Sequence, residues 1–318
     1  MLPLPESDPT EPVTLAGWVE LSLFAVDDSQ ISFGEVAEEL RDSNLLLDEG
    51  EDESATGERR ERQAAAEEVV ANIWSVLEER ERLLGRSCPF VVERRLIRRR
   101  ERRKSLQHVA AYVTMLLIEA AGKRWYPKIK LKKSDQMRTD FELVAAAALT
   151  GLGNTQVERL GVPYPGMEIT KFRSRVKELI GKFDLKPNIE ELKRFTHPRE
   201  KDRGLDLVVR LWNDDPSGGM PYLLVQCATG MTWVHEKAAQ PPMAAWIKFA
   251  TWDGPALKSI AVPYTVGRPR GLGDAWLRTN NSIIFDRLRL ARGSPDLWLD
   301  SKMRVKLAAW CRTQFDRL

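Results

Sequence analysis

Residues 201–230 read KDRGLDLVVRLWNDDPSGGMPYLLVQCATG. Two apolar, β-branched runs, 204–212 and 221–228, flank a loop rich in turn residues, and this pattern predicts a β-hairpin. An acid, Asp206, lies in the first run, and an amide, Gln226, lies near the end of the second. Neighbouring strands of a hairpin place such positions side by side, so we expect the two side chains to converge on one point.

This pair of side chains has a definite chemistry. A carboxylate beside an amide oxygen offers hard oxygen ligands, which suit Mg²⁺ or Mn²⁺ rather than zinc. Such an ion can polarise a phosphodiester and lower the pKa of an attacking water. The same pattern also fits a solvent-facing Asp and Gln on an ordinary hairpin, and periodicity alone favours that second interpretation.

The stretch resembles the PD-(D/E)xK nuclease superfamily, and more closely its methyl-directed restriction endonuclease branch. The pattern of that branch is a Gly-hydrophobic-Asp turn, an apolar strand, a loop and then hydrophobic-(Gln/Glu)-x-Lys. The chain has GLD at 204–206 and VQCA at 225–228. The resemblance covers roughly residues 136–265, less than half of the chain.

The resemblance implies an α+β fold, with a restriction-endonuclease-like mixed sheet flanked by helices, and apolar periodicity adds a helical N-terminal region. It makes Asp206 the main ligand of Mg²⁺ or Mn²⁺ and Gln226 the second ligand. The family also has a helix before the strands that carries a supporting Glu, and TDFELVAAAAL offers Glu142 for that role. These three residues are the expected metal site, and they also belong to the expected catalytic set.

The chain departs from the family at the motif lysine, which is replaced by Ala228. That lysine normally stabilises the charged phosphate or positions the water, so the site is either inactive or uses another lysine. Lys237, on the segment after the second strand, is our choice for the catalytic set. Lys248 would share its face on an unbroken helix, and Lys201 is a further candidate. His235 is an alternative phosphate contact or proton donor.

Charge is unevenly distributed along the chain. Residues 1–53 carry 15 acids and one basic residue, Arg41, for a local net charge of −14, whereas the remainder has a net charge of +17. The strongly basic remainder favours an acidic partner or substrate, and nucleic acid is the first candidate. The nuclease resemblance makes the expected nucleic acid DNA. The acidic N-terminal region is a candidate contact for a protein such as a defence-system ATPase. The alternative is a solvated surface with an acidic tail.

The segment VVERRLIRRRERRK (91–104) is the most basic part of the chain. One interpretation is a strip that tracks phosphates, and the other is a solvated helix face with internal Glu–Arg pairs. The nucleic-acid-binding residues of the first interpretation are Arg94, Arg95, Arg98, Arg99, Arg100, Arg102, Arg103 and Lys104.

The chain divides into three predicted parts: an acidic segment and linker (1–58), a basic helical region (59–133) and a nuclease-like domain with a C-terminal helix (134–318). Ser32 and Glu35 have the spacing of a helix capping box. Alternation predicts a strand in TLAGWVELSLFAV (14–26). Apolar periodicity and turn residues predict further helices over 59–84, 105–121, 134–152, 169–183 and 301–318, and further strands over 259–266 and 281–290.

The composition excludes several classes of protein. No run of about 18 apolar residues occurs, so we expect no membrane span. The acidic, Pro-rich N-terminus is unlike a secretory signal, and the three cysteines lie far apart, so we expect a cytoplasmic protein without disulfides.

These observations predict a metal-dependent DNA endonuclease, the nuclease effector of a bacterial anti-phage defence or restriction system. One alternative is a catalytically inactive nuclease-fold subunit that binds DNA or scaffolds a defence complex. Another is a helical adaptor that binds a protein through its acidic region.

Overall fold

The structure is a computed structural model of the 318-residue chain. It divides into two compact units, Met1–Lys130 together with Ser301–Leu318, and Leu131–Asp300. Each unit is described by itself. The described residues are 1–6, 11–25, 30–43, 55–100, 105–129, 135–160, 172–195, 203–214, 218–237, 239–266, 276, 278–279 and 281–318, without the side chains of 55–59 and 135–138.

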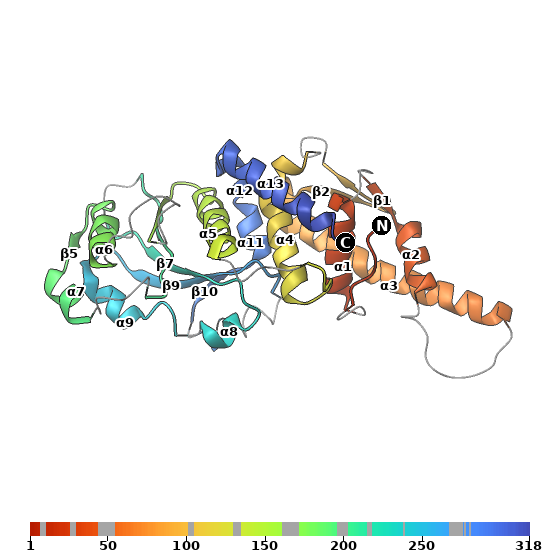
Figure 1. Cartoon of the computed structure of the whole chain (residues 1–318), viewed down its shortest axis with the longest axis horizontal. Helices are drawn as coiled ribbons and strands as arrows, with labels where there is room; N and C mark the ends of the chain where they lie inside the picture. The colour runs from red at the N-terminus through yellow and green to blue at the C-terminus, as the bar shows by residue number, and fades with distance from the viewer. Residues whose placement is uncertain are drawn as a thin grey trace. The chain divides into compact units, whose positions relative to one another are not determined.

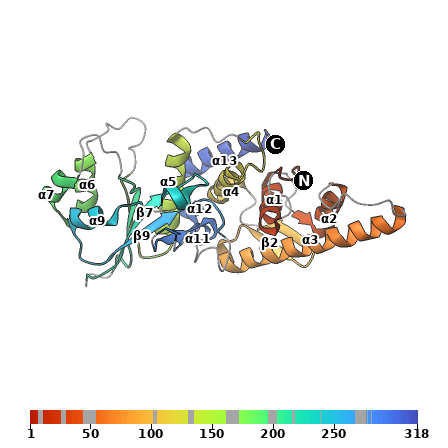
Figure 2. The ribbon, with the colours of Figure 1, turned by 90° about the horizontal axis from the view of Figure 1, so that it is seen from below.

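The first unit is mainly helical, with a small antiparallel sheet in which β3 lies between β1 and β2 (Figures 1 and 2). Its elements in chain order are α1 (Pro12–Ala25), β1 (Gln30–Ser32), α2 (Phe33–Asp42), α3 (Ala55–Leu84), η2 (Gly85–Ser87), β2 (Phe90–Glu93), β3 (Leu96–Arg99), η4 (Leu106–His108), α4 (Ala110–Gly122) and α13 (Ser301–Phe315).

The strand predicted over 14–26 is wrong, because this segment forms α1. Every residue from Thr14 to Phe24 is buried, and α1 packs against both α3 and α4. A helix that is buried on all sides shows no helical period in its sequence, so the few polar residues in the segment imitated alternation.

The predicted capping box at the start of α2 is confirmed. The Ser32 hydroxyl accepts a hydrogen bond from the Glu35 backbone N–H (3.2 Å), and the Glu35 carboxylate accepts one from the Ser32 N–H (2.6 Å). The helices predicted over 59–84 and 105–121 correspond to α3 and to η4 with α4. Local periodicity and capping decided these elements, so the sequence was sufficient to predict them.

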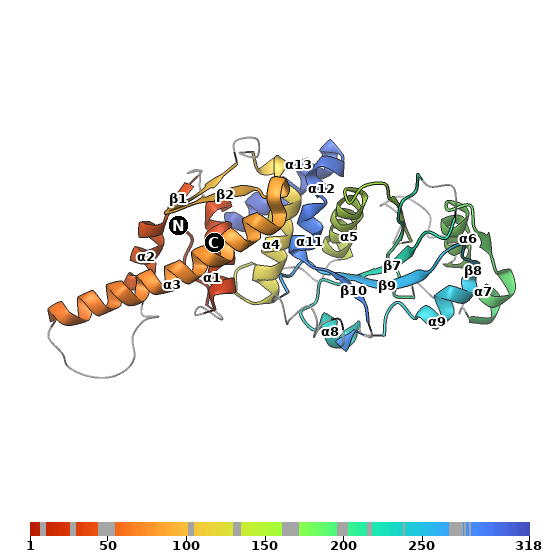
Figure 3. The same ribbon diagram turned by 180° about the vertical axis from the view of Figure 1, so that it is seen from behind.

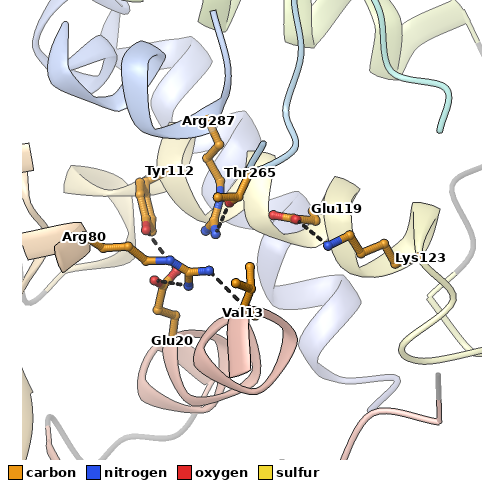
Figure 4. Close-up of polar contacts among 8 residues, drawn as sticks. All are labelled: Val13, Glu20, Arg80, Tyr112, Glu119, Lys123, Thr265 and Arg287. Atoms are coloured by element: carbon orange, nitrogen blue, oxygen red, sulfur yellow. Dashed lines mark hydrogen bonds and ion pairs between the residues drawn. The ribbon is translucent and has the colours of Figure 1, made fainter. Parts of the chain in front are cut away.

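A buried polar network joins the three packed helices of the first unit, as Figure 4 shows. Glu20 of α1 accepts hydrogen bonds from Arg80 Nη1 of α3 (2.7 Å) and from the Tyr112 hydroxyl of α4 (2.9 Å). Arg80 also donates to the Val13 carbonyl (3.0 Å). Because Glu20 and Arg80 are both almost fully buried, each charge depends on the other for compensation.

The second unit is a mixed sheet with helices on both faces: α5 lies on one side and α8 on the other (Figures 1 and 3). Its elements are α5 (Asp135–Thr150), β4 (Gln156–Arg159), α6 (Phe172–Gly181), β5 (Lys186–Pro187), α7 (Ile189–Phe195), β6 (Leu207–Arg210), β7 (Tyr222–Cys227), α8 (Trp233–Glu236), α9 (Met243–Trp246), η5 (Ile247–Phe249), β8 (Ala250–Thr251), β9 (Ala256–Ala261), β10 (Ile283–Phe285), α11 (Arg287–Arg292) and α12 (Pro295–Trp298).

The strands of the main sheet lie in the order β10-β9-β7-β6-β4. The neighbours β4, β6 and β7 are antiparallel, whereas β7, β9 and β10 are parallel. The hairpin predicted over 204–228 is therefore confirmed as β6 and β7, and the α+β class with a mixed, helix-flanked sheet is correct. The strand predicted over 281–290 ends at Phe285, because Asp286 caps α11 by accepting a hydrogen bond from the Arg289 N–H.

Two insertions build an accessory lobe on the sheet. The chain forms α6, β5 and α7 between β4 and β6, and it forms α9, η5 and β8 between β7 and β9. Strands β5 and β8 pair, and the two insertions share one hydrophobic cluster with Tyr222 and Leu224 of β7. Strand alternation places Gln226 on the same face of β7 as these two residues.

The two compact units differ from the three predicted parts in two respects. The described residues of the predicted parts 1–58 and 59–133 belong to one unit, in which α1 and α2 pack against α3. The boundary between the units lies at Lys130 and Leu131, near the predicted boundary at 133, but α13 belongs to the first unit, where it packs against α4. Residues 44–54, which include most of the predicted acidic linker, lie outside the described residues. No helix in the described part of the chain is long and apolar enough to cross a membrane.

Candidate active site

Asp206 and Gln226 meet where β6 begins and β7 ends, on two inner strands of the main sheet. Asp206 directly precedes β6, and Gln226 is the penultimate residue of β7. The Gln226 side-chain amide donates a hydrogen bond from Nε2 to Asp206 Oδ2 (2.8 Å), and both side chains are buried, with exposed fractions of 6% and 5%. The structure thus brings together the two residues that the sequence singled out.

The backbone of Asp206 is tied to both neighbouring strands. Its N–H donates to the Val225 carbonyl (2.9 Å), and its carbonyl accepts from the Leu160 N–H (2.9 Å). The Cys227 N–H donates to Asp206 Oδ2 (2.6 Å), so this one oxygen accepts two hydrogen bonds. Hydrogen bonds to a carboxylate are charge-assisted, and they hold the Asp206 side chain in one orientation.

The other side of the Gln226 amide is not satisfied. Its Oε1 atom is buried and has no hydrogen-bond partner among the described residues. Gly204 lies beside it with a φ of +66°, and a Cβ there would be 3.0 Å from Gln226 Oε1 and 2.9 Å from Gln240 Cβ. Only glycine adopts this conformation without strain and leaves the space beside the amide oxygen open.

Glu142 of α5 lies close enough to Cys227 of β7 for its charge to act on that thiol. Its Oε2 forms an ion pair with Arg159 Nη2 of β4 (3.0 Å). Burial raises the pKa of the Cys227 thiol well above its ordinary value, and the charges of Asp206 and Glu142 raise it further, whereas Arg159 lowers it. These charged groups therefore surround one thiol. Sequence reasoning missed Arg159, because no period or motif marks a four-residue strand.

Lys237, the predicted replacement for the motif lysine, is linked to this site through Gln240. It ends α8, and its Nζ donates to Gln240 Oε1 (3.3 Å). The Gln240 side chain in turn lies against Gly204, as the space around that glycine shows. Ala228, which occupies the position of the family's lysine, has no charged group. It is buried, and its N–H donates to the Ala261 carbonyl of β9.

The other candidate cations are placed differently. The unbroken helix that would align Lys248 with Lys237 does not exist, because α8 and α9 are separate helices with Pro241 and Pro242 between them. Lys248 is exposed and lies over the ring of Phe195, with 4.8 Å between its Nζ and the ring centroid. His235 is exposed on α8, and Lys201 lies outside the described residues.

The described part of the basic segment, 91–100, contains the β-hairpin of β2 and β3, so the helix-face interpretation is wrong for these residues. Arg94 and Arg95 form its turn, and the guanidinium of Arg95 lies over the Phe33 ring at 4.6 Å. Arg102, Arg103 and Lys104 lie outside the described residues.

Strand β3 and the residue after it carry three more arginines, and each of them contacts the first unit itself. Nε of Arg98 pairs with Glu93 (2.8 Å), Nε of Arg99 donates to the Leu23 carbonyl (2.7 Å), and Nη2 of Arg100 pairs with Glu81 (3.0 Å). Nucleic-acid binding by this strip stays a prediction, and any phosphate would have to compete with these contacts.

The donor atoms of the site suit a hard cation. Among the described residues no group of three or more His, Cys, Asp and Glu side chains is arranged to hold a metal ion. The site instead combines the Asp206 carboxylate with a buried amide oxygen that has no partner, beside a glycine that leaves space. Oxygen donors of this kind match Mg²⁺ or Mn²⁺. No family model, curated protein or solved structure matches the chain.

Proposed function

We propose that the second unit, Leu131–Asp300, is the catalytic domain of a metal-dependent DNA endonuclease that acts in restriction or anti-phage defence. The observation that carries this proposal is the contact between Asp206 and Gln226 on neighbouring strands, with an amide oxygen buried and unsatisfied beside the carboxylate. The resemblance of GLD (204–206) and VQCA (225–228) to the PD-(D/E)xK pattern supports it. So does the mixed sheet with helices on both faces.

Each residue has a role in this proposal. Asp206 and Gln226 hold Mg²⁺ or Mn²⁺, which polarises the phosphodiester when it is bound. Glu142, which forms an ion pair with Arg159, adds negative charge near Cys227, the residue after Gln226, and negative charge attracts the cation. Lys237 supplies the positive charge that the family places at position 228, because its partner Gln240 lies next to Gly204.

Cleavage of supercoiled plasmid in Mg²⁺ or Mn²⁺ tests the proposal. We expect the parent protein to nick or linearise the plasmid and Asp206→Ala to be inactive, because the cation loses its central ligand. Asp214→Ala is the matched control. Asp214 is an exposed acid in the loop of the same hairpin, and its carboxylate accepts a hydrogen bond from the side chain of Asn154. Activity that survives Asp206→Ala contradicts the assignment.

A second candidate function is a nuclease-fold subunit that binds DNA without cutting it. The burial of Ala228 at the motif-lysine position favours it, and so do the two N–H groups that satisfy Asp206 Oδ2 without a metal. If the parent binds DNA but leaves the plasmid intact with both metals, this second function replaces the first.

A further inference from the structure

We propose that Arg194, Arg203 and Lys248, which gather around Phe195, form a phosphate-binding cluster that anchors the DNA strand next to the candidate active site. This inference rests on the proposed function for the identity of the ligand. The four residues, here called the Phe195 cluster, belong to the accessory lobe and to the turn that leads into β6.

The geometry brings together residues that are far apart in the sequence. Lys248 Nζ lies 4.8 Å and Arg194 Cζ lies 5.2 Å from the centroid of the Phe195 ring. Arg203 Nη1 donates a hydrogen bond to the Phe195 carbonyl. Three cations are thus placed around one aromatic residue, and basic residues with an aromatic ring are the combination that tracks a nucleic-acid backbone.

The cluster is fixed by the core of the lobe. Phe195 is the last residue of α7, and Lys248 lies in η5 between the buried residues Trp246 and Phe249. The Trp246 indole N–H donates to the Arg203 carbonyl (3.3 Å), which ties the turn to α9. These contacts hold the backbone of the cluster in place without a ligand, and a preorganised site loses less conformational entropy when it binds.

The cluster lies within a short reach of Asp206. Arg203 precedes Asp206 by three residues, so their Cα atoms are at most about 11 Å apart. One strand of DNA advances about 3.4 Å per nucleotide, so this distance corresponds to roughly three nucleotides. A strand that passes Arg203 would therefore bring a phosphate near Asp206 within roughly three nucleotides.

The exposed cations of the cluster are available for a phosphate. The Arg194 side chain is 73% exposed, and its ion pair with Glu191, which is 24% exposed, is long at 3.7 Å and therefore weak. Lys248 is exposed next to Ile247, whose side chain is 50% exposed. Arg99 of β3 and Arg100 after it differ from Arg194 and Lys248, because Arg99 and Arg100 donate to backbone carbonyl groups of their own unit.

The test measures the salt dependence of DNA binding without metal, so that no cleavage occurs. A labelled duplex is titrated by fluorescence anisotropy with the full-length Asp206→Ala protein, with and without Arg194→Gln and Lys248→Gln. Two lost phosphate contacts should reduce the slope of log affinity against log salt by about 1.8. Arg203 is left unchanged, because it also holds the lobe together.

The matched control removes two other exposed lysines from the same lobe, Lys177 of α6 and Lys186 of β5. This pair of Gln substitutions changes the net charge equally, and we expect the slope to stay the same. An unchanged slope for the Arg194 and Lys248 variant, or an equal change in the control, overturns the inference. Circular dichroism confirms that each variant is folded, and the single Lys248→Gln variant should lose about half of the effect.

The result is separable from the fate of the nuclease proposal. Plasmid cleavage by the parent with an unchanged slope would leave the proposed function standing and remove the cluster. A reduced slope in a protein that never cuts DNA would support the cluster and favour the non-catalytic function.

Discussion

Replacing Gly204 by alanine should destabilise the second unit, because an alanine there would adopt a strained backbone conformation and its Cβ would have no free space. Its φ is +66°, and an L-residue in the left-handed region costs about 1–2 kcal/mol. The added Cβ would lie 2.9 Å from Cβ and Cγ of Gln240, and the Cβ of Gln240 cannot move without its backbone. Overpacking of this kind costs roughly 1–3 kcal/mol. We therefore expect a total loss of about 2–5 kcal/mol.

Thermal unfolding followed by circular dichroism measures this loss. For a domain of this size, each kcal/mol lowers the melting temperature by about 2–4 °C, so Gly204→Ala should lower it by roughly 4–20 °C. The same methyl group would lie 3.0 Å from Gln226 Oε1, so cleavage by the variant should also fall if this oxygen is a ligand.

Gly153→Ala is the matched control. Gly153 has a φ of +87°, but no atom lies within 4 Å of the position of its Cβ. It should therefore show the backbone cost alone, and the difference between the two variants gives the cost of the contact with Gln240. Equal melting temperatures for the two variants would refute the packing argument, and a parental melting temperature for both would refute the argument from strain.

Three further predictions concern buried charge, catalysis and pH. Glu20→Gln leaves the Arg80 guanidinium buried without its carboxylate, so the free energy of unfolding measured in urea should fall by about 3–5 kcal/mol. A fall of less than about 1 kcal/mol would contradict the role of this buried ion pair. Lys237→Ala should lower the rate of plasmid cleavage by a factor of about 10²–10³ and retain DNA affinity, whereas the control Lys186→Ala should cleave like the parent. Parental activity in Lys237→Ala would exclude Lys237 from the catalytic set. Burial raises the pKa of the Cys88 thiol above its ordinary value of 9.0, so the unfolded state loses this proton first as the pH rises. The free energy of unfolding should therefore fall by up to about 1.4 kcal/mol per pH unit above pH 9, and Cys88→Ala should show a smaller fall in urea titrations; equal slopes would contradict the burial effect.

The sequence alone determined the elements that depend on local chemistry. The capping box of Ser32 and Glu35 and the periodicity of α3 are properties of neighbouring residues, so they could be predicted without tertiary contacts. The same holds for the hairpin of β6 and β7, because turn residues separate two β-branched runs. That hairpin also fixed which side chains would meet, and the contact between Asp206 and Gln226 follows from it.

Only the tertiary structure decided the features that depend on burial and on distant partners. Helix α1 is buried on all sides, so its sequence carries no helical period. Residues 90–93 and 96–99 pair as strands, although the charges of this segment suited a helix face. The unsatisfied oxygen of Gln226 is visible only when its surroundings are known. Phe195 and Lys248 meet because two insertions pack into one lobe around a common hydrophobic cluster, and no local pattern relates residues so far apart in the chain.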